Sequence, residues 1–370
     1  MELSYWEYKS WLSDIDFTIV GSGIVGLSTA LSLKEKYPKA NVLILEKGIL
    51  PQGASTKNAG FACFGSISEV LSDLETHSEE EVAHLVAQRW KGIQVLRTLL
   101  GDKKIGFQTL GGHEIFLEND GQLYEKSLDN LSPINKLLAP IFGGEPFYTF
   151  ENRFDFKHIK PNYITHRFEG QLDTGQMMLG LLDLVQGNGI RILNNSAVKS
   201  FEEVGGGVGV QTNNFELKSR KLLLATNGFS QQILKEDVNP ARAQVLITEP
   251  IENLNIEGTF HFDQGYYYFR NIDKRILFGG GRNLDIETEK TTKFGQTALV
   301  HNELEKLLKE VILPNTPFEI DRRWSGIMGV GRQKKPIIKQ LSRNTYCGIR
   351  LGGMGVAIGT LVGKELADLI

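Results

Sequence analysis

The strongest constraint on the fold is a glycine-rich turn between an apolar strand and a helix near the N-terminus. The turn has the spacing G-x-G-x-x-G, and its glycines are Gly21, Gly23 and Gly26. The first permits a tight turn, the second lets a pyrophosphate approach the backbone, and the third lets the helix pack closely on the strand. The free N–H groups at the start of the helix, around Ile24 and Val25, then face the phosphates. Because apolar strands at 17–20 and 42–45 flank this turn and helix, the order predicts a dinucleotide-binding βαβ unit.

Glu46 stands at the end of the second strand, twenty residues after Gly26. A carboxylate at this place accepts hydrogen bonds from ribose hydroxyls and repels a 2′-phosphate, so NADP is the least favoured ligand. A nicotinamide-dependent dehydrogenase has the same turn and the same acid. The first unit alone therefore leaves the kind of dinucleotide open.

Size and composition narrow the class of protein. With 370 residues, the chain exceeds the size at which one core stops growing, so we expect two domains or one large interrupted domain. A net charge of -3 gives no basic surface for nucleic acid and favours small-molecule partners. Cys63 and Cys347 are too few for a disulfide framework, and the seven histidines show no metal-ligand spacing. Without a signal-peptide pattern or a long apolar run, we expect a cytoplasmic protein with no membrane span.

Beyond the first unit, the patterns indicate two sheets. A Gly-, Ser- and Asn-rich stretch at 48–68 predicts a long loop, and apolar spacing predicts a helix over 78–100. A buried strand at 221–228 ends in small residues, and alternation between 243 and 320 indicates a mostly antiparallel sheet. A second glycine-rich turn, at 352–355, leads into the last helix.

Five further blocks occur in the order typical of one family. They are GASTKNAGF at 53–61, LATNG at 224–228, YYYFR at 266–270 running to RILFGGG at 275–281, WSGI at 324–327 and GGMGV at 352–356. With the opening turn, these blocks resemble the D-amino-acid-oxidase-like family of FAD oxidoreductases, which includes glycine oxidase, sarcosine oxidase and gamma-glutamylputrescine oxidase. The resemblance spans nearly the whole chain.

The resemblance implies an α/β fold, α+β overall, with a Rossmann-like FAD-binding domain and a mostly antiparallel β-sheet substrate domain. The FAD-binding domain is expected to combine the separated segments 1–75, 155–240 and 320–370. The substrate domain is expected in residues 76–154 and 241–319.

The resemblance also implies which residues surround a noncovalently bound FAD. Those not yet named are Lys47, Ser55, Asn58, Ala59, Gly60, Val198, Ala225, Thr226, Asn227, Gly228, Gly353, Met354, Gly355, Val356 and Ala357. The residues from Gly353 onward would meet the pyrimidine end of the flavin, where reduction places negative charge that N–H groups at a helix N-terminus stabilise. Noncovalent attachment is expected because Met328 stands in the segment where some sarcosine oxidases bind the flavin through a cysteine.

At the reacting end, the family implies hydride removal from the carbon next to an amine, followed by hydrolysis of the imine. The candidate residues there are Tyr267, Arg270 and Met354. Tyr267 and Arg270 are three residues apart in one predicted strand, so they point to opposite faces unless the strand bends. Met328 also replaces the arginine with which glycine oxidase holds a carboxylate. We expect the neighbouring Arg332 and Arg350 to be solvated at the surface.

Two other functions stay open. One is an FAD-dependent 2-hydroxy-acid dehydrogenase of the same fold, and the other is a non-catalytic flavin-binding or electron-transfer module. The small-molecule partner is thus an amine, an amino acid or a hydroxy acid, and the electron acceptor is oxygen, a quinone or an electron-transfer protein. Leu277 stands where some oxidases of the family carry a lysine near the flavin. This difference does not decide between an oxidase and a dehydrogenase.

Overall fold

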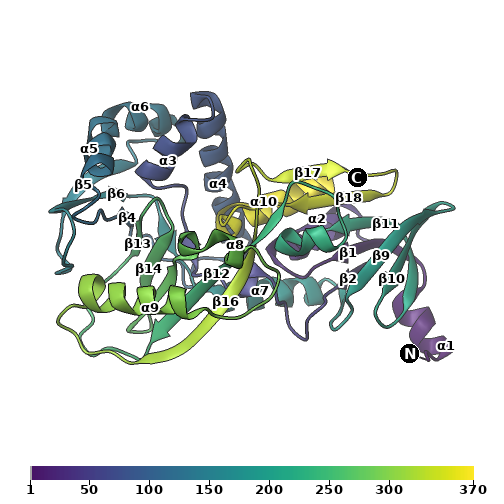
Figure 1. Ribbon diagram of the computed structural model, residues 1–370. Helices are drawn as coiled ribbons and strands as arrows, with labels where there is room; N and C mark the ends of the chain where they lie inside the picture. Colours follow the sequence, from purple (N-terminus) through teal and green to yellow (C-terminus); the bar gives the residue numbers. More distant parts are fainter. Residues whose placement is uncertain (1) are drawn as a thin grey trace.

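The computed structural model describes residues 2–370 and contains two eight-stranded sheets and one two-stranded sheet. The two large sheets lie in separate lobes, and both chain termini lie in the lobe of the first sheet (Figure 1). Among residues 2–370, no helix combines the length and the apolar character that a membrane crossing requires.

The first sheet has a parallel centre, in the order β17, β18, β11, β1, β2 and β8. Its strands are β1 (Ile15–Val20), β2 (Val42–Leu45), β8 (Arg191–Leu193), β11 (Glu216–Leu224), β18 (Thr345–Ile349) and the antiparallel edge strand β17 (Ile337–Gln340). The hairpin of β9 (Val198–Val204) and β10 (Gly207–Thr212) pairs with β11. Strand β2 is buried along its whole length, as expected for a parallel strand covered on both faces.

Helices α2 (Ile24–Lys36), α7 (Thr174–Gly187) and α10 (Gly355–Asp368) belong to the lobe of the first sheet, and α4 (Glu79–Leu100) packs on α10. A capping box begins α4, because the Ser78 hydroxyl accepts a hydrogen bond from the Glu81 N–H and the Glu81 carboxylate accepts one from the Ser78 N–H. The predicted helix over 78–100 is therefore confirmed.

The second sheet has the order β16, β12, β15, β14, β13, β4, β6 and β5, and only its β13–β4 pair is parallel. Its strands are β4 (Gly112–Glu114), β5 (Phe147–Glu151), β6 (Asn162–His166), β12 (Asn239–Thr248), β13 (Thr259–Phe262), β14 (Tyr267–Ile272), β15 (Arg275–Gly280) and β16 (Ile320–Val330). Aromatic side chains fill its core, where the rings of Phe260 and Phe269 stack with centroids 4.6 Å apart.

Shorter elements complete the chain. They are α1 (Tyr5–Glu7), α3 (Ile67–Leu74), α5 (Gly121–Asp129), α6 (Leu131–Phe142), α8 (Ile286–Glu289), α9 (Ala298–Leu307) and the two strands of the small sheet, β3 (Phe61–Ala62) and β7 (Gly170–Gln171). Short 3-10 turns lie at Ala54–Thr56, Asn227–Gln232 and Arg282–Leu284, and π-helical turns at Tyr8–Leu12 and Leu308–Ile312.

Some elements do not pair or pack within the domain to which the boundaries predicted from the sequence assign them. β16 and β6 pair within the second sheet, although the sequence analysis places their segments in the FAD-binding domain. Conversely, α4 packs on α10, although its segment is expected in the substrate domain. The physical reason is that a hydrophobic period specifies the type of an element and not the sheet against which it packs.

Candidate active site

The glycine turn after β1 has the geometry that a pyrophosphate site needs. Gly21 has a positive φ of 105°, and its N–H donates to the carbonyl of Leu45 at 2.8 Å, which holds the turn against β2. A Cβ on Gly26 would overlap the carbonyl oxygen of Gly21. A Cβ on Gly23 would come within 2.8 Å of the Ser55 hydroxyl. The turn therefore depends on all three glycines, each for a separate steric reason.

The start of α2 presents hydrogen-bond donors to the space in front of the turn. The Ile24 N–H donates to the Ser55 hydroxyl at 3.0 Å, so the loop residue Ser55 lies directly at the helix N-terminus. Asn58 shapes the same loop, because its side-chain amide donates to the Ser55 carbonyl at 2.8 Å and its oxygen accepts from the Gly60 N–H at 2.8 Å. The loop that the sequence predicts to wrap a ligand thus folds over the turn.

Glu46 is buried and held in a fixed orientation at the end of β2. Its Oε2 accepts hydrogen bonds from the Ser22 N–H at 3.1 Å and the Ser22 hydroxyl at 2.8 Å, and its Oε1 accepts from the Gly48 N–H at 2.9 Å. Next to it, the Lys47 ammonium lies 3.1 Å from the centre of the Phe229 ring, and burial lowers the pKa of Lys47.

A second glycine-rich turn precedes α10. Gly352 and Gly353 have positive φ angles of 58° and 86°, and Met354 caps the helix. Asn227, at the end of β11, accepts hydrogen bonds from the N–H groups of Arg350 and Leu351 at 3.1 and 3.2 Å. This contact ties the strand end that flanks the first turn to the loop that carries the second.

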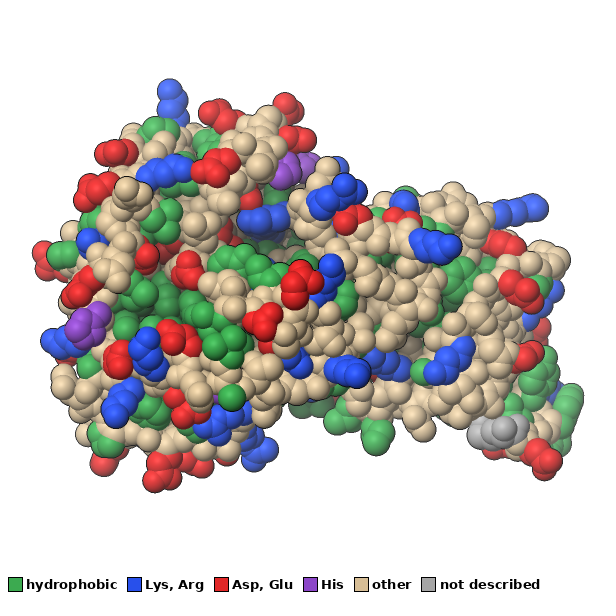
Figure 2. All heavy atoms as spheres, in the orientation of Figure 1, with side chains coloured by type: hydrophobic (Ala, Val, Ile, Leu, Met, Phe, Trp, Pro, Cys, Tyr) green, Lys and Arg blue, Asp and Glu red, His purple; other side chains and the backbone are tan. Residues whose placement is uncertain are grey.

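One cavity of about 680 Å³ extends along both turns and onto the second sheet. Its lining includes every residue of the expected FAD set apart from Gly26, Gly60 and Ala357. Figure 2 shows one face of the molecule, where hydrophobic side chains gather in the hollowed region between the lobes, with charged side chains around them. The sequence analysis thus names residues, far apart in the chain, that the fold brings together around one space.

The three residues predicted at the reacting end differ in whether they line the cavity. Met354 lines the cavity, and its sulfur lies 3.5 Å from that of Cys63. Tyr267 does not line it: the ring stacks on Phe262 at 4.9 Å within the core of the second sheet, and burial raises the pKa of Tyr267 to about 12. Arg270 also lies outside the lining and is 3 % exposed, and burial lowers the pKa of Arg270 to about 10.

The two arginines near the second turn, Arg332 and Arg350, differ in their exposure to solvent. Arg332 is exposed, as expected. The prediction of a surface position is wrong for Arg350, which is buried and pairs with Asp237 at 3.0 Å. Its Nε also donates to the Lys335 carbonyl at 2.9 Å, so Arg350 is used to hold the loop before α10.

Four residues that the sequence analysis does not propose line the cavity around β13 and β14. They are Glu69, His261, Tyr268 and Arg282. Strand alternation places Tyr268 opposite Tyr267, but only the packing of β14 shows which face meets the cavity. Glu69 is recognisable in the sequence only as the acid of a capping box with Ser66, and His261 is a single histidine in an apolar strand.

The residues fit an FAD molecule. The first turn leaves room for a pyrophosphate because its glycines lack side chains, and Ile24 and Val25 at the start of α2 line the same cavity. Glu46 lies at the end of the neighbouring strand β2, twenty residues after Gly26. An acidic residue at this spacing from the turn binds the ribose of a dinucleotide. The N-terminus of α10 then opens into the same cavity, where it can stabilise negative charge on a flavin ring.

Comparisons with known proteins agree with this geometry. The sequence model of the family described as FAD dependent oxidoreductase (DAO) matches residues 16–369. The probable oxidoreductase OrdL of Haemophilus influenzae is 24% identical over 380 residues, which cover 96% of this chain and 82% of that protein. The gamma-glutamylputrescine oxidoreductase of Escherichia coli is 24% identical, with 96% and 83% covered.

Solved structures show the same fold. The glycine oxidase of Geobacillus kaustophilus superposes with a TM-score of 0.76 at 19% identity, covering 96% of this chain and 94% of that one. The L-proline dehydrogenase of P. horikoshii gives a TM-score of 0.75 at 17% identity, covering 96% and 93%. Because the family match extends over nearly the whole chain and the cavity fits the cofactor, this chain belongs to the FAD dependent oxidoreductase (DAO) family and is an FAD-dependent oxidoreductase.

Proposed function

We propose that the protein oxidises the C–N bond of a small amine or amino acid, giving an imine that water then hydrolyses. The observation that carries this proposal is the single cavity that joins the FAD residues to a substrate wall on β13 and β14. FAD, when bound, supplies at N5 the acceptor for a hydride from the carbon next to the amine. Relatives are named for amine and amino-acid substrates, including the gamma-glutamylputrescine oxidoreductase and the glycine oxidase.

The chain's own task is to orient the substrate and exclude water. Phe61 and Tyr268 form an aromatic wall, with ring centroids 5.7 Å apart. Met354 and Cys63 close the side next to α10. These apolar groups favour a desolvated substrate, and the catalytic contacts that we propose are Met354 and Tyr268, with Tyr267 acting as packing behind Tyr268.

Arg282 supports a substrate that carries a carboxylate. Its guanidinium lies 5.0 Å from the centre of the Tyr266 ring, and no carboxylate among residues 2–370 forms an ion pair with it. By contrast, Lys334, another cation of this end, is 2.6 Å from Asp73. Burial raises the pKa of Tyr268 to about 12, and the charge of Arg282 opposes that rise, so the two groups face the same region. A guanidinium and a hydroxyl so placed can hold a carboxylate.

FAD is held without a covalent link in this proposal. Met328 lines the cavity, and its thioether has no thiol that could form the cysteine-type link. Burial raises the pKa of Cys63 well above its ordinary value, so the thiol stays protonated and unreactive. Denaturing the yellow protein with acid should leave the chromophore in the supernatant, and a yellow pellet would contradict this.

The test of the proposed function is a substrate screen on the FAD-loaded protein. Amines, amino acids and 2-hydroxy acids are added without oxygen, and bleaching of the flavin absorbance is measured. We expect an amine or amino acid to bleach the flavin. Bleaching by hydroxy acids alone would favour the 2-hydroxy-acid dehydrogenase instead, and bleaching by no compound would favour a module without turnover. Peroxide formation on admitting air then separates an oxidase from a dehydrogenase.

A further inference from the structure

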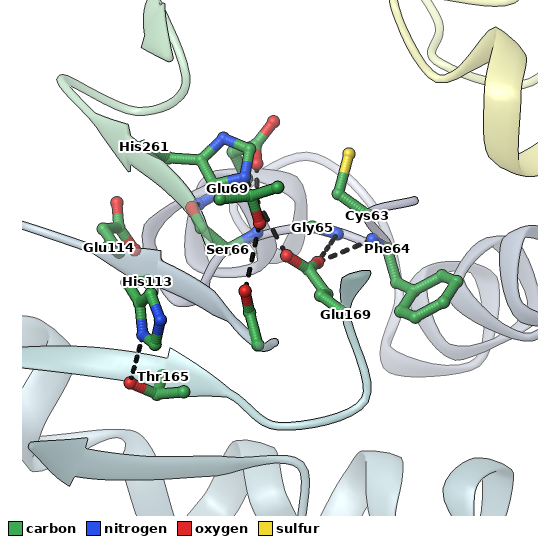
Figure 3. A network of polar contacts seen from close by, with 12 residues as sticks. Cys63, Phe64, Gly65, Ser66, Glu69, His113, Glu114, Thr165, Glu169 and His261 are labelled. Carbon is green, nitrogen blue, oxygen red and sulfur yellow. Dashed lines mark hydrogen bonds and ion pairs between the residues drawn. The ribbon is translucent and has the colours of Figure 1, made fainter. Parts of the chain in front are cut away.

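A buried carboxyl and an imidazole meet behind the substrate wall. Glu169 is 1 % exposed, and its Oε1 accepts hydrogen bonds from the N–H groups of Phe64 and Gly65 at 2.7 and 3.3 Å. Its Oε2 lies 3.8 Å from Nε2 of His261 (Figure 3). This separation exceeds a hydrogen bond, and burial favours the neutral form of both groups. Glu169 thus faces His261 with one oxygen while the other holds the loop next to Cys63.

A glycine next to Glu169 leaves space for this carboxyl. A Cβ on Gly112 of β4 would overlap Glu169 Oε2, so the glycine leaves the space that the carboxyl occupies beside β13. The backbone hydrogen bonds come from the segment that carries Cys63 into the cavity. The carboxyl is therefore placed by two elements, and the charge of Arg89 on α4 acts on it.

His261 connects this carboxyl to the cavity. The imidazole lines the cavity and packs edge-on against Phe61, with ring centroids 5.1 Å apart. Its Nε2 is buried and has no hydrogen-bond partner among residues 2–370. An unpartnered buried nitrogen costs free energy. In the part of the chain that the structure describes, His113, His166 and His301 also have such nitrogens, but only the ring of His261 lines the cavity.

We propose that His261 accepts a proton from the ammonium group of the substrate and that Glu169 takes up the proton that leaves Nε2. The ammonium gives one proton to Nδ1 of the imidazole, and Nε2 passes its own proton to the carboxylate when substrate binding brings these two atoms from 3.8 Å to hydrogen-bond distance, so the imidazole stays neutral. The pair gains one proton and the amine regains its lone pair, which the loss of a hydride from the neighbouring carbon requires. This inference rests on the proposed function, since it assigns a role within amine oxidation.

The surroundings suit this role. Burial raises the pKa of Glu169 to about 8 and lowers that of His261, so a proton taken up by the pair rests on the carboxyl, which is ionised and able to accept it once the pH approaches 8. A pKa near the operating pH suits a group that both accepts and releases a proton. The titratable or charged groups around the pair are Glu69 on α3, Arg89 on α4, His113 on β4, His166 on β6, Tyr268 on β14 and Cys63. Of these, Glu69, Tyr268 and Cys63 line the cavity, and the carboxylate of Glu69 attracts an ammonium.

The experiment measures binding of propylamine to the FAD-loaded protein from pH 6 to 10.5 through the shift of the flavin spectrum. Propylamine serves as a probe because its pKa is close to that of a lysine side chain, about 10.4. If the pair accepts the proton, affinity rises up to about pH 8 and then changes less than about threefold to pH 10. Without an acceptor, only the neutral amine binds, and affinity rises about 100-fold between pH 8 and 10.

The variants Glu169→Gln and His261→Asn should both show this 100-fold rise. Glutamine retains an oxygen for the Phe64 and Gly65 N–H groups, so FAD content and the thermal midpoint serve to confirm that the variant is folded. The matched control is Glu114→Gln, a buried carboxyl on the adjacent β4 that bonds to Ser68 and does not line the cavity. The pH dependence of its propylamine affinity should match that of the wild type.

Three results would overturn the inference. They are a 100-fold rise in the wild type itself, pH profiles of both variants that coincide with the wild type, and no propylamine binding by the wild type at pH 9. The proposed function is judged separately by flavin bleaching. Bleaching with unchanged profiles rejects the proton acceptor alone, and the expected profiles without bleaching by any compound reject the proposed function alone.

Discussion

Replacing Glu169 by glutamine should change how the stability of the protein depends on pH. In the folded protein, burial raises the pKa of Glu169 from its ordinary value of 4.5 to about 8. Between these two values the unfolded chain releases the proton and the folded chain keeps it. Stability from this group is therefore fully present below pH 4.5 and is lost as the pH rises through 8.

The size of the effect follows from the same two values. The pKa of Glu169 rises from 4.5 in the unfolded chain to about 8 in the folded protein. At about 1.4 kcal/mol per pH unit, this rise changes the free energy of unfolding by at most about 5 kcal/mol. Relaxation around the charged carboxylate and its coupling to His261 reduce this figure, so we expect about 2–5 kcal/mol. Glutamine does not titrate, and the variant should therefore gain stability relative to the wild type as the pH rises from 5 to 8.

Urea unfolding at pH 5, 6, 7 and 8 measures this difference for the wild type and for Glu169→Gln. Glu114→Gln offers a second buried carboxyl, whose pKa burial raises to about 7, so its gain should end one pH unit earlier. A difference between Glu169→Gln and the wild type that stays constant from pH 5 to 8 would show that Glu169 is ionised in the folded protein. The reasoning about its burial would then fail.

Three further changes probe the two ends of the cavity. Gly26→Ala places a Cβ against the turn carbonyl, so purified protein should contain much less FAD, whereas Gly187→Ala, which meets no atom within 4 Å, should retain it. Arg282→Gln should raise KM at least tenfold for substrates with a carboxylate and leave amines without one unchanged, because a charge-assisted contact is lost. Tyr268→Phe should alter the steady-state kinetics and Tyr267→Phe should not, because only the first lines the cavity. Equal flavin content, equal KM changes or equal kinetics in these comparisons would contradict the respective assignments.

The cofactor end of the cavity was predictable because it depends on the backbone. A turn that must bring a helix N-terminus to a phosphate needs glycines at fixed spacing, and Gly21, Gly23 and Gly26 are readable without any knowledge of the rest of the chain. The same holds for the turn before α10, where Gly352 and Gly353 adopt positive φ angles. At these places, local sterics restrict both the residue type and the conformation.

The substrate end was less predictable because it depends on side chains from distant strands. Alternation shows that Tyr267 and Tyr268 point to opposite faces, yet the face that meets the cavity follows only from how β14 packs on its neighbours. Arg350 illustrates the same point, since its partner Asp237 lies 113 residues away in the sequence and turns an expected surface residue into a buried one.

The sequence by itself thus determined the dinucleotide turn, the acid that follows it, the final glycine turn and, through their order, the family. Tertiary structure alone decided that β16 and β6 join the second sheet, that His261 and Tyr268 line the cavity, and that Glu169 lies next to His261. The physical reason is range: glycine geometry acts within a few residues, whereas burial and pairing of polar groups depend on contacts between segments far apart in the chain.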